Sequence, residues 1–435
     1  MSIKATIDCN LSCEYCYEHG LRKHQKGLTR WNIEKIKETM KKEYERRPET
    51  PSFHGGEPLV LPKKELENLM KFGYDLAGRM GIQTNGTLID DDHIALFKKY
   101  NVNVGISFDG PWPLNKARAD KETTDELVKT IYKLVAKGLR PGMIMVLHRY
   151  NGLPEHRQIL KDWLLELHSL GIKGGRLNLA EINDPEVKER LELRPKEAAD
   201  LYKDLAKFTL FENDDMRWQP FRDVVDNMLG LGTGTCVFGK CDFFQAVAER
   251  CITGTGELST CYKNAINDHT YFYDPSKELG KERYQILKNV PQENGGCGNC
   301  KYWPICYGGC PAEGEYNGDI DWRHRTRHCA PWKVTYELIE KYIKRIFPNI
   351  QLIAERTLEE TPKNDYQLRS GNRLEPSTLK FMLPRYSNRA SSWRGEAKSN
   401  CKSNCKVNTY TDAPRVEEER HGDMAHGDHT DHGDS

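Results

Sequence analysis

The 435-residue chain lacks the features that mark membrane proteins and nucleic-acid-binding proteins. No apolar run approaches the roughly 18 residues of a transmembrane helix, and the N-terminus lacks the charged-then-apolar pattern of a signal peptide. Neither charge sign is in excess, because 65 Lys and Arg residues balance 64 Asp and Glu residues. Such a balance provides no overall attraction to nucleic acid or to an anionic membrane. The composition therefore predicts a cytoplasmic protein with no nucleic-acid partner and no membrane contact.

Cysteine is missing from residues 17–235, although the chain contains 14 cysteines. Three lie in residues 9–16, nine in residues 236–329, and two at positions 401 and 405. Disulfides are disfavoured in a reducing compartment, so clustered cysteines there indicate metal binding or redox chemistry. The distribution predicts two separate metal-binding regions.

Strand-like segments alternate with amphipathic, helix-like segments as far as about residue 212. This alternation predicts a parallel sheet built of βαβ units. Six units are fewer than the eight of a closed barrel, so we expect an α/β fold with a partial (β/α)6 TIM-like barrel over residues 1–215. Sites in such sheets form at the C-terminal ends of the strands. The expected strands are residues 2–8, 51–56, 81–86, 102–110, 142–148 and 174–182, and the expected helices are residues 31–47, 63–78, 89–100, 122–138, 155–170 and 196–212.

The pattern changes after the barrel. Residues 216–350 are rich in Gly and Cys with little periodicity, which is typical of a small domain held together by metal rather than by a large core. A helix over residues 331–346 is expected to close this domain. Residues 351–435 lose apolar periodicity and end in a His/Asp/Gly-rich segment, so we predict a largely disordered C-terminal tail.

The first cysteine block, Cys9-x3-Cys13-x2-Cys16, directly follows the first expected strand. Three thiolates on one tight loop can hold three corners of a cubane iron–sulfur cluster, which leaves the fourth iron open to a small chelating molecule. Spacing alone leaves two alternatives open. One is a zinc site completed by His19, and the other is a set of buried thiols.

This block resembles the signature of the radical S-adenosylmethionine (SAM) enzymes, with Tyr15 in the aromatic position. Two further motifs follow in the family's order: Gly-Gly-Glu-Pro (55–58) after the second strand and Ser-Phe-Asp-Gly-Pro (107–111) after the fourth. The resemblance covers residues 1 to about 215. It implies a 4Fe–4S cluster that passes an electron to SAM and so generates a 5′-deoxyadenosyl radical, which abstracts a substrate hydrogen. The cluster ligands that it implies are Cys9, Cys13 and Cys16, and the SAM contacts are Tyr15, Gly55, Gly56, Glu57, Ser107, Arg118 and Leu179.

Within these SAM contacts, the resemblance implies that Glu57 binds the methionyl ammonium and that Ser107 contacts the ribose. The residue types fit, because a carboxylate at a strand end can pair with an ammonium. Glycines at 55 and 56 also allow a ligand to approach the backbone closely. The alternative for the four residues by themselves is an ordinary Gly-Pro turn.

The second cysteine region has a long and specific spacing. An expected hairpin with Gly256 precedes Cys261, and the run Cys297-x2-Cys300-x5-Cys306-x3-Cys310 is followed by a last cysteine at 329. This order resembles the SPASM domain, which is appended to many radical SAM enzymes. The resemblance implies two auxiliary 4Fe–4S clusters, one held by Cys236, Cys241, Cys261 and Cys310 and the other by Cys297, Cys300, Cys306 and Cys329.

Two alternatives remain for this second region. Cys-x2-Cys pairs also build zinc sites. Cys251 is surplus to the two sets of ligands, and we expect a buried strand cysteine there rather than a ligand.

SPASM enzymes mostly modify peptides or proteins, and the chain resembles both anaerobic sulfatase-maturating enzymes and ribosomal-peptide maturases. In the sulfatase-maturating group an Asp after the last hairpin cysteine is the proposed base, whereas Tyr262 stands here. A tyrosine with a pKa near 10 is a poor base at neutral pH. We therefore predict a thioether or carbon–carbon cross-link in a peptide, with Tyr262, Asp242 or His148 as weak candidates for the base. The alternatives are oxidation of a Cys or Ser to formylglycine and, in another class, a non-catalytic metal-binding scaffold.

The resemblance also implies partners: a peptide or protein substrate and an electron donor such as flavodoxin or ferredoxin. Because the chain begins one strand before the first cysteines, we expect no leader-binding domain, so a separate protein or the SPASM region binds the leader. The tail segment around Cys401 and Cys405 is either a fused substrate or an incidental pair of thiols. Its histidines, His421, His426, His429 and His432, either bind a metal loosely or form a solvated tail.

Overall fold

The computed structural model describes residues 1–18, 31–182, 184–231, 241, 250–261, 263, 279–350 and 352. No helix within these ranges is long and apolar enough to span a membrane. Several residues named above lie outside the described residues: His19, Cys236, Asp242, Tyr262 and the tail with Cys401 and Cys405.

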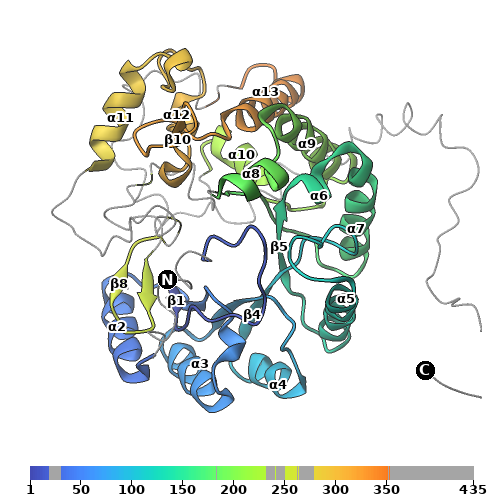
Figure 1. Ribbon diagram of the computed structural model, residues 1–435, viewed down its shortest axis with the longest axis vertical. Coiled ribbons are helices and arrows are strands. Elements are labelled where there is room, and N and C mark those ends of the chain that lie inside the picture. The colour runs from blue at the N-terminus through green and yellow to red at the C-terminus, as the bar shows by residue number, and fades with distance from the viewer. Residues whose placement is uncertain are drawn as a thin grey trace, which may run out of the picture. The chain divides into compact units, whose positions relative to one another are not determined.

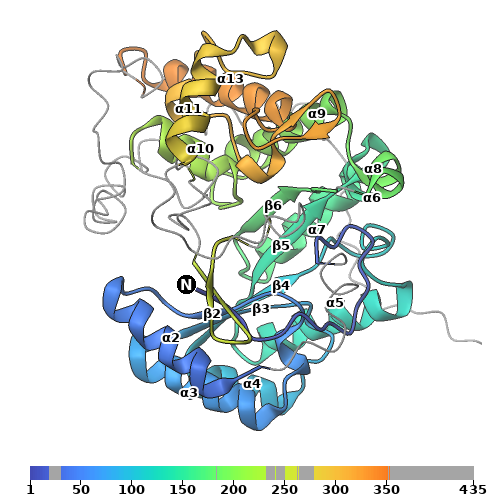
Figure 2. The same ribbon diagram turned by 60° about the vertical axis from the view of Figure 1, so that its left-hand side comes forward.

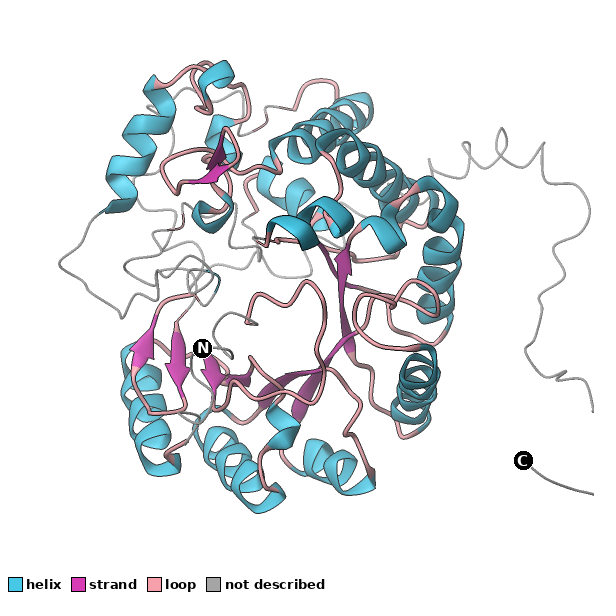
Figure 3. Cartoon of the chain, viewed as in Figure 1, coloured by secondary structure: helices cyan, strands magenta, loops and turns pink. Residues whose placement is uncertain are grey.

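Six parallel strands form the N-terminal sheet, in the order β6-β5-β4-β3-β2-β1. Strands that are neighbours in the sequence are therefore neighbours in the sheet, as short βαβ crossovers require. Figure 3 shows the strands as an arc with helices along its outer side. This arrangement confirms the expected partial (β/α)6 barrel. The strands are Ser2–Lys4 (β1), Ser52–Phe53 (β2), Met80–Thr84 (β3), Val102–Ser107 (β4), Gly142–Leu147 (β5) and Gly175–Leu179 (β6).

The helices between the strands bury an apolar stripe against the sheet (Figure 1). Aspartates and an asparagine fix where several of them begin: Asn32 accepts from the backbone N–H of Lys35 at 3.0 Å, and Asp120 accepts from that of Thr123 at 2.8 Å. The helices of this part are Ile33–Arg46 (α2), Lys63–Ala77 (α3), Asp91–Lys99 (α4), Lys121–Ala136 (α5), Arg149–Gly152 (α6), Arg157–Ser169 (α7), Pro185–Leu191 (α8) and Pro195–Lys207 (α9).

The hairpin expected at residues 251–261 is present, and it joins the barrel sheet. Its first strand, Cys251–Thr253 (β7), pairs in parallel with β1, and its second, Leu258–Ser259 (β8), pairs antiparallel with β7. The sheet therefore has eight strands and ends at β8. The pairing of Ser2 with Cys251 was not foreseen from the sequence, because it joins segments far apart in the chain.

The cysteine-rich region carries mostly short elements, which lie in the upper part of Figure 2. The final helix packs along α9, where the Trp332 ring meets the Tyr202 ring edge to face at 5.4 Å. The elements of this region are Phe221–Met228 (α10), Leu279–Asn289 (α11), Trp303–Cys306 (α12), Glu315–Tyr316 (β9), Asp319–Ile320 (β10) and Cys329–Ile346 (α13).

Candidate active site

The three-cysteine loop leaves β1 and is held against the loop that follows β4. The backbone N–H of Glu14 donates to the carbonyl of Ala117 at 2.8 Å, and that of Cys16 donates to the carbonyl of Cys13 at 3.0 Å. The pKa of the Cys13 thiol is raised to about 11, chiefly by burial; Arg118 acts to lower it, and the neighbouring thiols of Cys16 and Cys9 act to raise it. The three thiols are therefore close enough to interact electrostatically, as the ligands of one cluster must be.

The Gly-Gly-Glu turn after β2 lies directly on this loop. The backbone N–H of Glu57 donates to the carbonyl of Asp8 at 2.7 Å, and that of Gly56 donates to the Glu18 carboxylate at 2.7 Å. Gly55 and Gly56 have φ values of +76° and +52°, and a Cβ on Gly56 would overlap the carbonyl oxygen of Asp8. Other parts of the chain, namely Lys4 and the backbone of residues 6–8, thus pack closely against these two glycines.

Glu57 is fully buried, and its carboxylate binds the end of β3. It accepts from the Thr84 hydroxyl at 2.6 Å, from the backbone N–H of Asn85 at 2.7 Å and from that of Leu59 at 3.0 Å. Burial raises its pKa, which these three hydrogen bonds oppose. These contacts fix the Gly-Gly-Glu turn against the end of β3. They use three of about four acceptor sites of the carboxylate, and the contact of Glu57 with a ligand stays a prediction.

Asn85, which was not among the expected site residues, connects β3 to the cysteine loop. Its side-chain amide donates to Asn10 at 2.9 Å and points to the sulfur of Cys9 at 3.7 Å. An amide N–H directed at a cluster sulfur is one way in which proteins tune such clusters. The signal in the sequence was its place in the Thr-Asn-Gly-Thr segment at a strand end.

A buried cluster of four side chains lies beside the cysteine loop, centred on Asp109. The Asp109 carboxylate stands 3.3 Å from the Arg118 guanidinium and 3.4 Å from the His148 ring, and it accepts a hydrogen bond from the Tyr15 hydroxyl. Both Asp109 and His148 are inaccessible to solvent. Burial raises the pKa of Asp109, but Arg118 and His148 outweigh it and hold the pKa at about 2. Tyr15 and Arg118, both named from the sequence, thus meet at Asp109, which the sequence analysis did not single out.

Ser107 and Leu179 occupy the last positions of β4 and β6. Ser107 accepts from the Gln83 amide at 2.8 Å, and Leu179 is buried. Both lie at the same end of the sheet as the cysteine loop, because all six strands are parallel.

An acidic pair bridged by a lysine follows β6. Lys263 forms an ion pair with Glu181 and lies 3.5 Å from Glu313, whose carboxylate also accepts from the Thr326 hydroxyl at 2.6 Å. Burial raises the pKa of Glu181, and the nearby Glu313 carboxylate raises it further, while Lys263 lowers it. Lys263 stands two residues after Cys261 and therefore joins the hairpin to the end of the barrel. No sequence pattern indicates this contact, because its three members are far apart in the chain.

The four cysteines expected to hold the second auxiliary cluster line one cavity. The cavity is walled by aromatic side chains, Trp303, Trp332 and Tyr336, and burial raises the pKa of both the Cys297 and the Cys306 thiols to about 12. Neighbouring thiols contribute to both raised pKa values, as expected of cysteines that line one cavity. The lining cysteines are Cys297, Cys300, Cys306 and Cys329.

The other auxiliary set is only partly described. Cys241, Cys261 and Cys310 lie within the described residues, and Cys236 does not. Arg283 is buried between the two sets, since the thiols of Cys310, Cys297 and Cys241 all act on its pKa. Its guanidinium donates to the carbonyls of Tyr307 and Gly308 at 3.1 and 3.2 Å. Cys251 is buried in β7.

Within the described ranges, no three His, Cys, Asp or Glu side chains converge closely enough to hold a single metal ion. Thiolates of a cubane bind different irons, so they do not need to converge as zinc ligands do. The all-cysteine donor sets and their aromatic surroundings fit iron–sulfur clusters.

Residues 3–164 match the family model described as the Radical SAM superfamily. Enzymes of this superfamily use a 4Fe–4S cluster and SAM. Residues 3–164 are therefore a radical SAM domain, and the chain is similar along most of its length to an anaerobic sulfatase-maturating enzyme.

Individual relatives span most of both chains. An uncharacterised protein of Archaeoglobus fulgidus is 29% identical over 333 residues, covering 72% of this chain and 74% of its own length. A cysteine-type anaerobic sulfatase-maturating enzyme of Clostridium novyi is 24% identical over 340 residues, covering 72% of this chain and 87% of its own. A solved structure, native anSMEcpe with bound AdoMet and Cp18Cys peptide, is similar in fold, with a TM-score of 0.63, 18% identity, and coverage of 80% of this chain and 99% of that one.

Proposed function

We propose that this enzyme oxidises a peptide or protein substrate by closing a thioether or carbon–carbon cross-link within it. The observation that carries the proposal is the convergence of the three-cysteine loop, the Gly-Gly-Glu turn and the Asp109–Arg118 pair at one end of the sheet. A 4Fe–4S cluster and SAM, when bound there, supply a 5′-deoxyadenosyl radical that abstracts a substrate hydrogen. The cluster ligands in this proposal are Cys9, Cys13 and Cys16.

The buried side chains hold this loop in one place. Arg118 stands 3.8 Å from the Cys13 sulfur, and its cationic group lies 5.5 Å from the centre of the Tyr15 ring. Asp109 fixes Arg118, so the guanidinium supplies a positive charge beside the thiolates. SAM contacts are proposed at Tyr15, Gly55, Gly56, Glu57, Ser107, Arg118 and Leu179.

The two auxiliary clusters complete the proposal, for three clusters in all. Both sets have four cysteines, which leaves their irons without an open position and suits electron transfer. The proposed ligands are Cys236, Cys241, Cys261 and Cys310 for one cluster and Cys297, Cys300, Cys306 and Cys329 for the other.

Glu181 is the proton acceptor that this proposal assigns. It follows β6 at the end of the sheet where the cysteine loop lies, and Lys263 holds it next to Glu313. A carboxylate with a raised pKa is better matched to accepting a proton near neutral pH than an ordinary one. Tyr262 and Asp242, which lie outside the described residues, are the remaining candidates, and His148 is already bound to Asp109.

Sulfatase maturation is the second candidate function, favoured by the relative in Clostridium novyi. The two reactions are separated by incubating reconstituted enzyme, SAM and dithionite with two peptides: a cysteine-containing sulfatase-type peptide and a peptide of residues 401–435. Loss of two hydrogens without an aldehyde supports cross-linking, whereas an aldehyde in place of the thiol supports formylglycine formation. An unchanged mass of the 401–435 peptide shows that the tail is not a substrate.

A further inference from the structure

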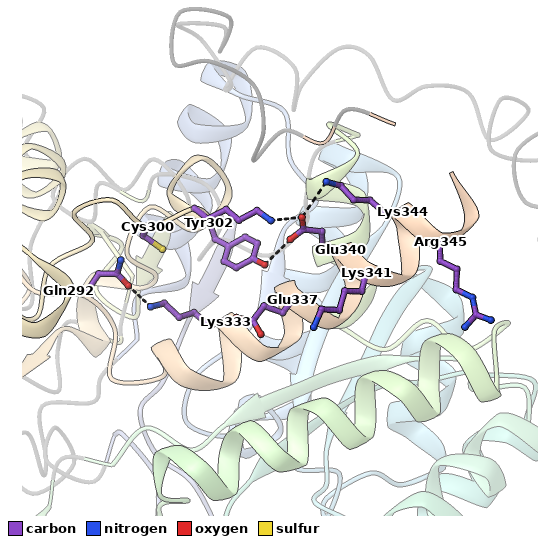
Figure 4. Close-up of a pocket in the computed structure, with 10 residues that line it drawn as sticks. Gln292, Cys300, Tyr302, Lys333, Glu337, Glu340, Lys341, Lys344 and Arg345 are labelled. Atoms are coloured by element: carbon purple, nitrogen blue, oxygen red, sulfur yellow. Dashed lines mark hydrogen bonds and ion pairs between the residues drawn. The ribbon is translucent and has the colours of Figure 1, made fainter. Parts of the chain in front are cut away.

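A basic pocket of about 720 Å³ opens beside the cavity of the four cysteines. Three residues, Cys300, Tyr302 and Lys333, line both the pocket and the cavity. The pocket and the proposed site of the second auxiliary cluster therefore share a wall at these residues. Figure 4 shows the Cys300 sulfur at one end of the pocket and the basic side chains of α13 along it.

The pocket carries a local excess of positive charge. Four lysines and one arginine line it, against two glutamates. One of these, Glu340, is engaged on both oxygens, because it binds Lys301 and accepts from the Tyr302 hydroxyl at 2.8 Å, with Lys344 at 3.6 Å. The whole chain has a net charge of only +1, so this excess belongs to the pocket and not to the general surface.

Most of the charged side chains of this pocket lie along α13, the helix that begins at the proposed ligand Cys329. Residues 333, 337, 341 and 345 are spaced four apart on α13, so they lie in one stripe along its surface. The helix starts at Cys329, and Lys341 and Arg345 further along the stripe are exposed. A partner bound along this stripe therefore contacts α13, which begins at the proposed ligand Cys329. It also lies next to the pocket wall at Cys300, another proposed ligand of the same cluster.

We propose that this pocket is the docking surface for an acidic one-electron carrier protein, which exchanges electrons with the cluster held by Cys297, Cys300, Cys306 and Cys329. The inference rests on the proposed function. Clustered cations opposite an acidic partner speed association and select the partner by charge. Cys300, a proposed cluster ligand, lines this pocket, so a partner bound there lies close to the cluster. A redox partner needs that proximity, whereas an acidic peptide or a nucleic acid does not.

The proposed reaction requires such an exchange. Closing a thioether or carbon–carbon bond removes two hydrogens from the peptide. One leaves as a hydrogen atom that ends in 5′-deoxyadenosine, and the other leaves as a proton, accepted by Glu181, and an electron. The auxiliary clusters, when bound, would pass that electron to the oxidised carrier at this surface, and the carrier is reduced by one electron. The separate electron that cleaves SAM comes from a reductant such as dithionite.

The test measures binding rather than turnover. Reconstituted enzyme is titrated calorimetrically with an acidic flavodoxin and an acidic ferredoxin at low and at high salt. We expect a double charge reversal, Lys341→Glu with Arg345→Glu, to weaken binding of at least one carrier by 10-fold or more at low salt, on the order of 1.4 kcal/mol. High salt removes most of that difference, because screening shortens the reach of exposed charges.

The control is a reversal of equal charge and spacing on another helix, Lys129→Glu with Lys133→Glu on α5, which leaves carrier binding unchanged. Iron content and melting temperature show whether each variant folds. Equal binding by both variants overturns the proposal, as does an acidic polyglutamate peptide that binds this surface while neither carrier does. Dithionite-driven cleavage of SAM by the unaltered enzyme tests the proposed function separately, because dithionite needs no docking surface.

Discussion

Arg118 lies between Asp109 and Cys13, 3.3 Å from the carboxylate and 3.8 Å from the sulfur. One buried cation thus connects the end of β4 to the middle of the three-cysteine loop. Its charge lowers the pKa of both groups, which favours the ionised carboxylate and the thiolate that a metal requires. This contact makes the loop depend on a residue 105 positions away in the sequence.

Replacing Asp109 tests how far the site depends on this contact. Asp109→Asn leaves the buried Arg118 without its carboxylate, and breaking a buried ion pair typically costs about 3 kcal/mol or more. We expect urea denaturation to show a loss of that order and SAM binding to weaken. Asp125→Asn is the matched control, since Asp125 pairs with Lys121 on the surface, where such pairs contribute less than about 1 kcal/mol. Equal stability of the two variants would contradict the account.

Gly56 and Gly78 form a second matched pair. Both have positive φ, +52° and +68°, so alanine strains the backbone at each by roughly 1 kcal/mol. Only at Gly56 does the added Cβ meet the backbone of residues 6–8, while at Gly78 nothing lies within 4 Å. We expect Gly56→Ala to abolish SAM binding in equilibrium dialysis and Gly78→Ala to retain it. Retained binding in the Gly56 variant would show that the turn tolerates displacement.

Iron content tests the assignment of the cysteines. Three clusters predict ~12 irons per chain after anaerobic reconstitution, and Cys329→Ala is expected to reduce this to ~8. Cys251→Ala removes a buried strand cysteine and leaves the iron unchanged. Iron that falls equally in both variants would make Cys251 a ligand. Stoichiometric zinc in place of iron would support the zinc alternative.

Glu181→Gln tests the proton acceptor. We expect cross-linked product to fall by about 100-fold or more, while formation of 5′-deoxyadenosine continues, because hydrogen abstraction precedes proton loss. Unaltered enzyme loses product formation as the pH falls through the raised pKa of Glu181, since a base must be deprotonated, and the variant lacks this dependence. Four groups surround the carboxylate and are kept in both proteins: Lys263, Glu313, Tyr202 and His328.

Glu192→Gln is the control for that experiment. Glu192 is also a buried carboxylate after β6 with a raised pKa, but it faces Arg327 at 3.7 Å instead of Lys263. Its variant is expected to keep product and deoxyadenosine formation coupled. Loss of coupling in both variants would point to a general disturbance of the segment.

The barrel could be predicted because its strands and helices are set by local patterns. Apolar residues alternate with other residues in segment 102–110 and form a continuous run in segment 142–148. Both patterns are typical of buried strands, and β4 and β5 lie within these segments. The pairing of β7 with β1 could not be predicted, since nothing in three residues specifies a partner 249 positions away. The same limit hid Glu181, Lys263 and Glu313, which are separate in sequence and meet only through the fold.

Motif spacing brought Cys13, Tyr15 and Arg118 together, and the contact that it predicts between Glu57 and the ligand stays a prediction. The structure gives that carboxylate three donors from its own chain. A sequence pattern identifies which residues meet at a site, whereas the direction of each hydrogen bond depends on coordinates. Asp109 was missed for the same reason, because its partners Tyr15, Arg118, Val146 and His148 come from three separate segments.

The most direct test of the central claim is the yield of 5′-deoxyadenosine from SAM and dithionite under anaerobic conditions, measured by chromatography for the unaltered enzyme and for Cys13→Ala. The account predicts deoxyadenosine from the unaltered enzyme and none from the variant, because Cys13→Ala removes one of the three proposed ligands of the cluster that binds SAM. Cys251→Ala, measured in parallel, keeps the activity. Deoxyadenosine from Cys13→Ala, or none from an iron-loaded unaltered enzyme, would contradict the account.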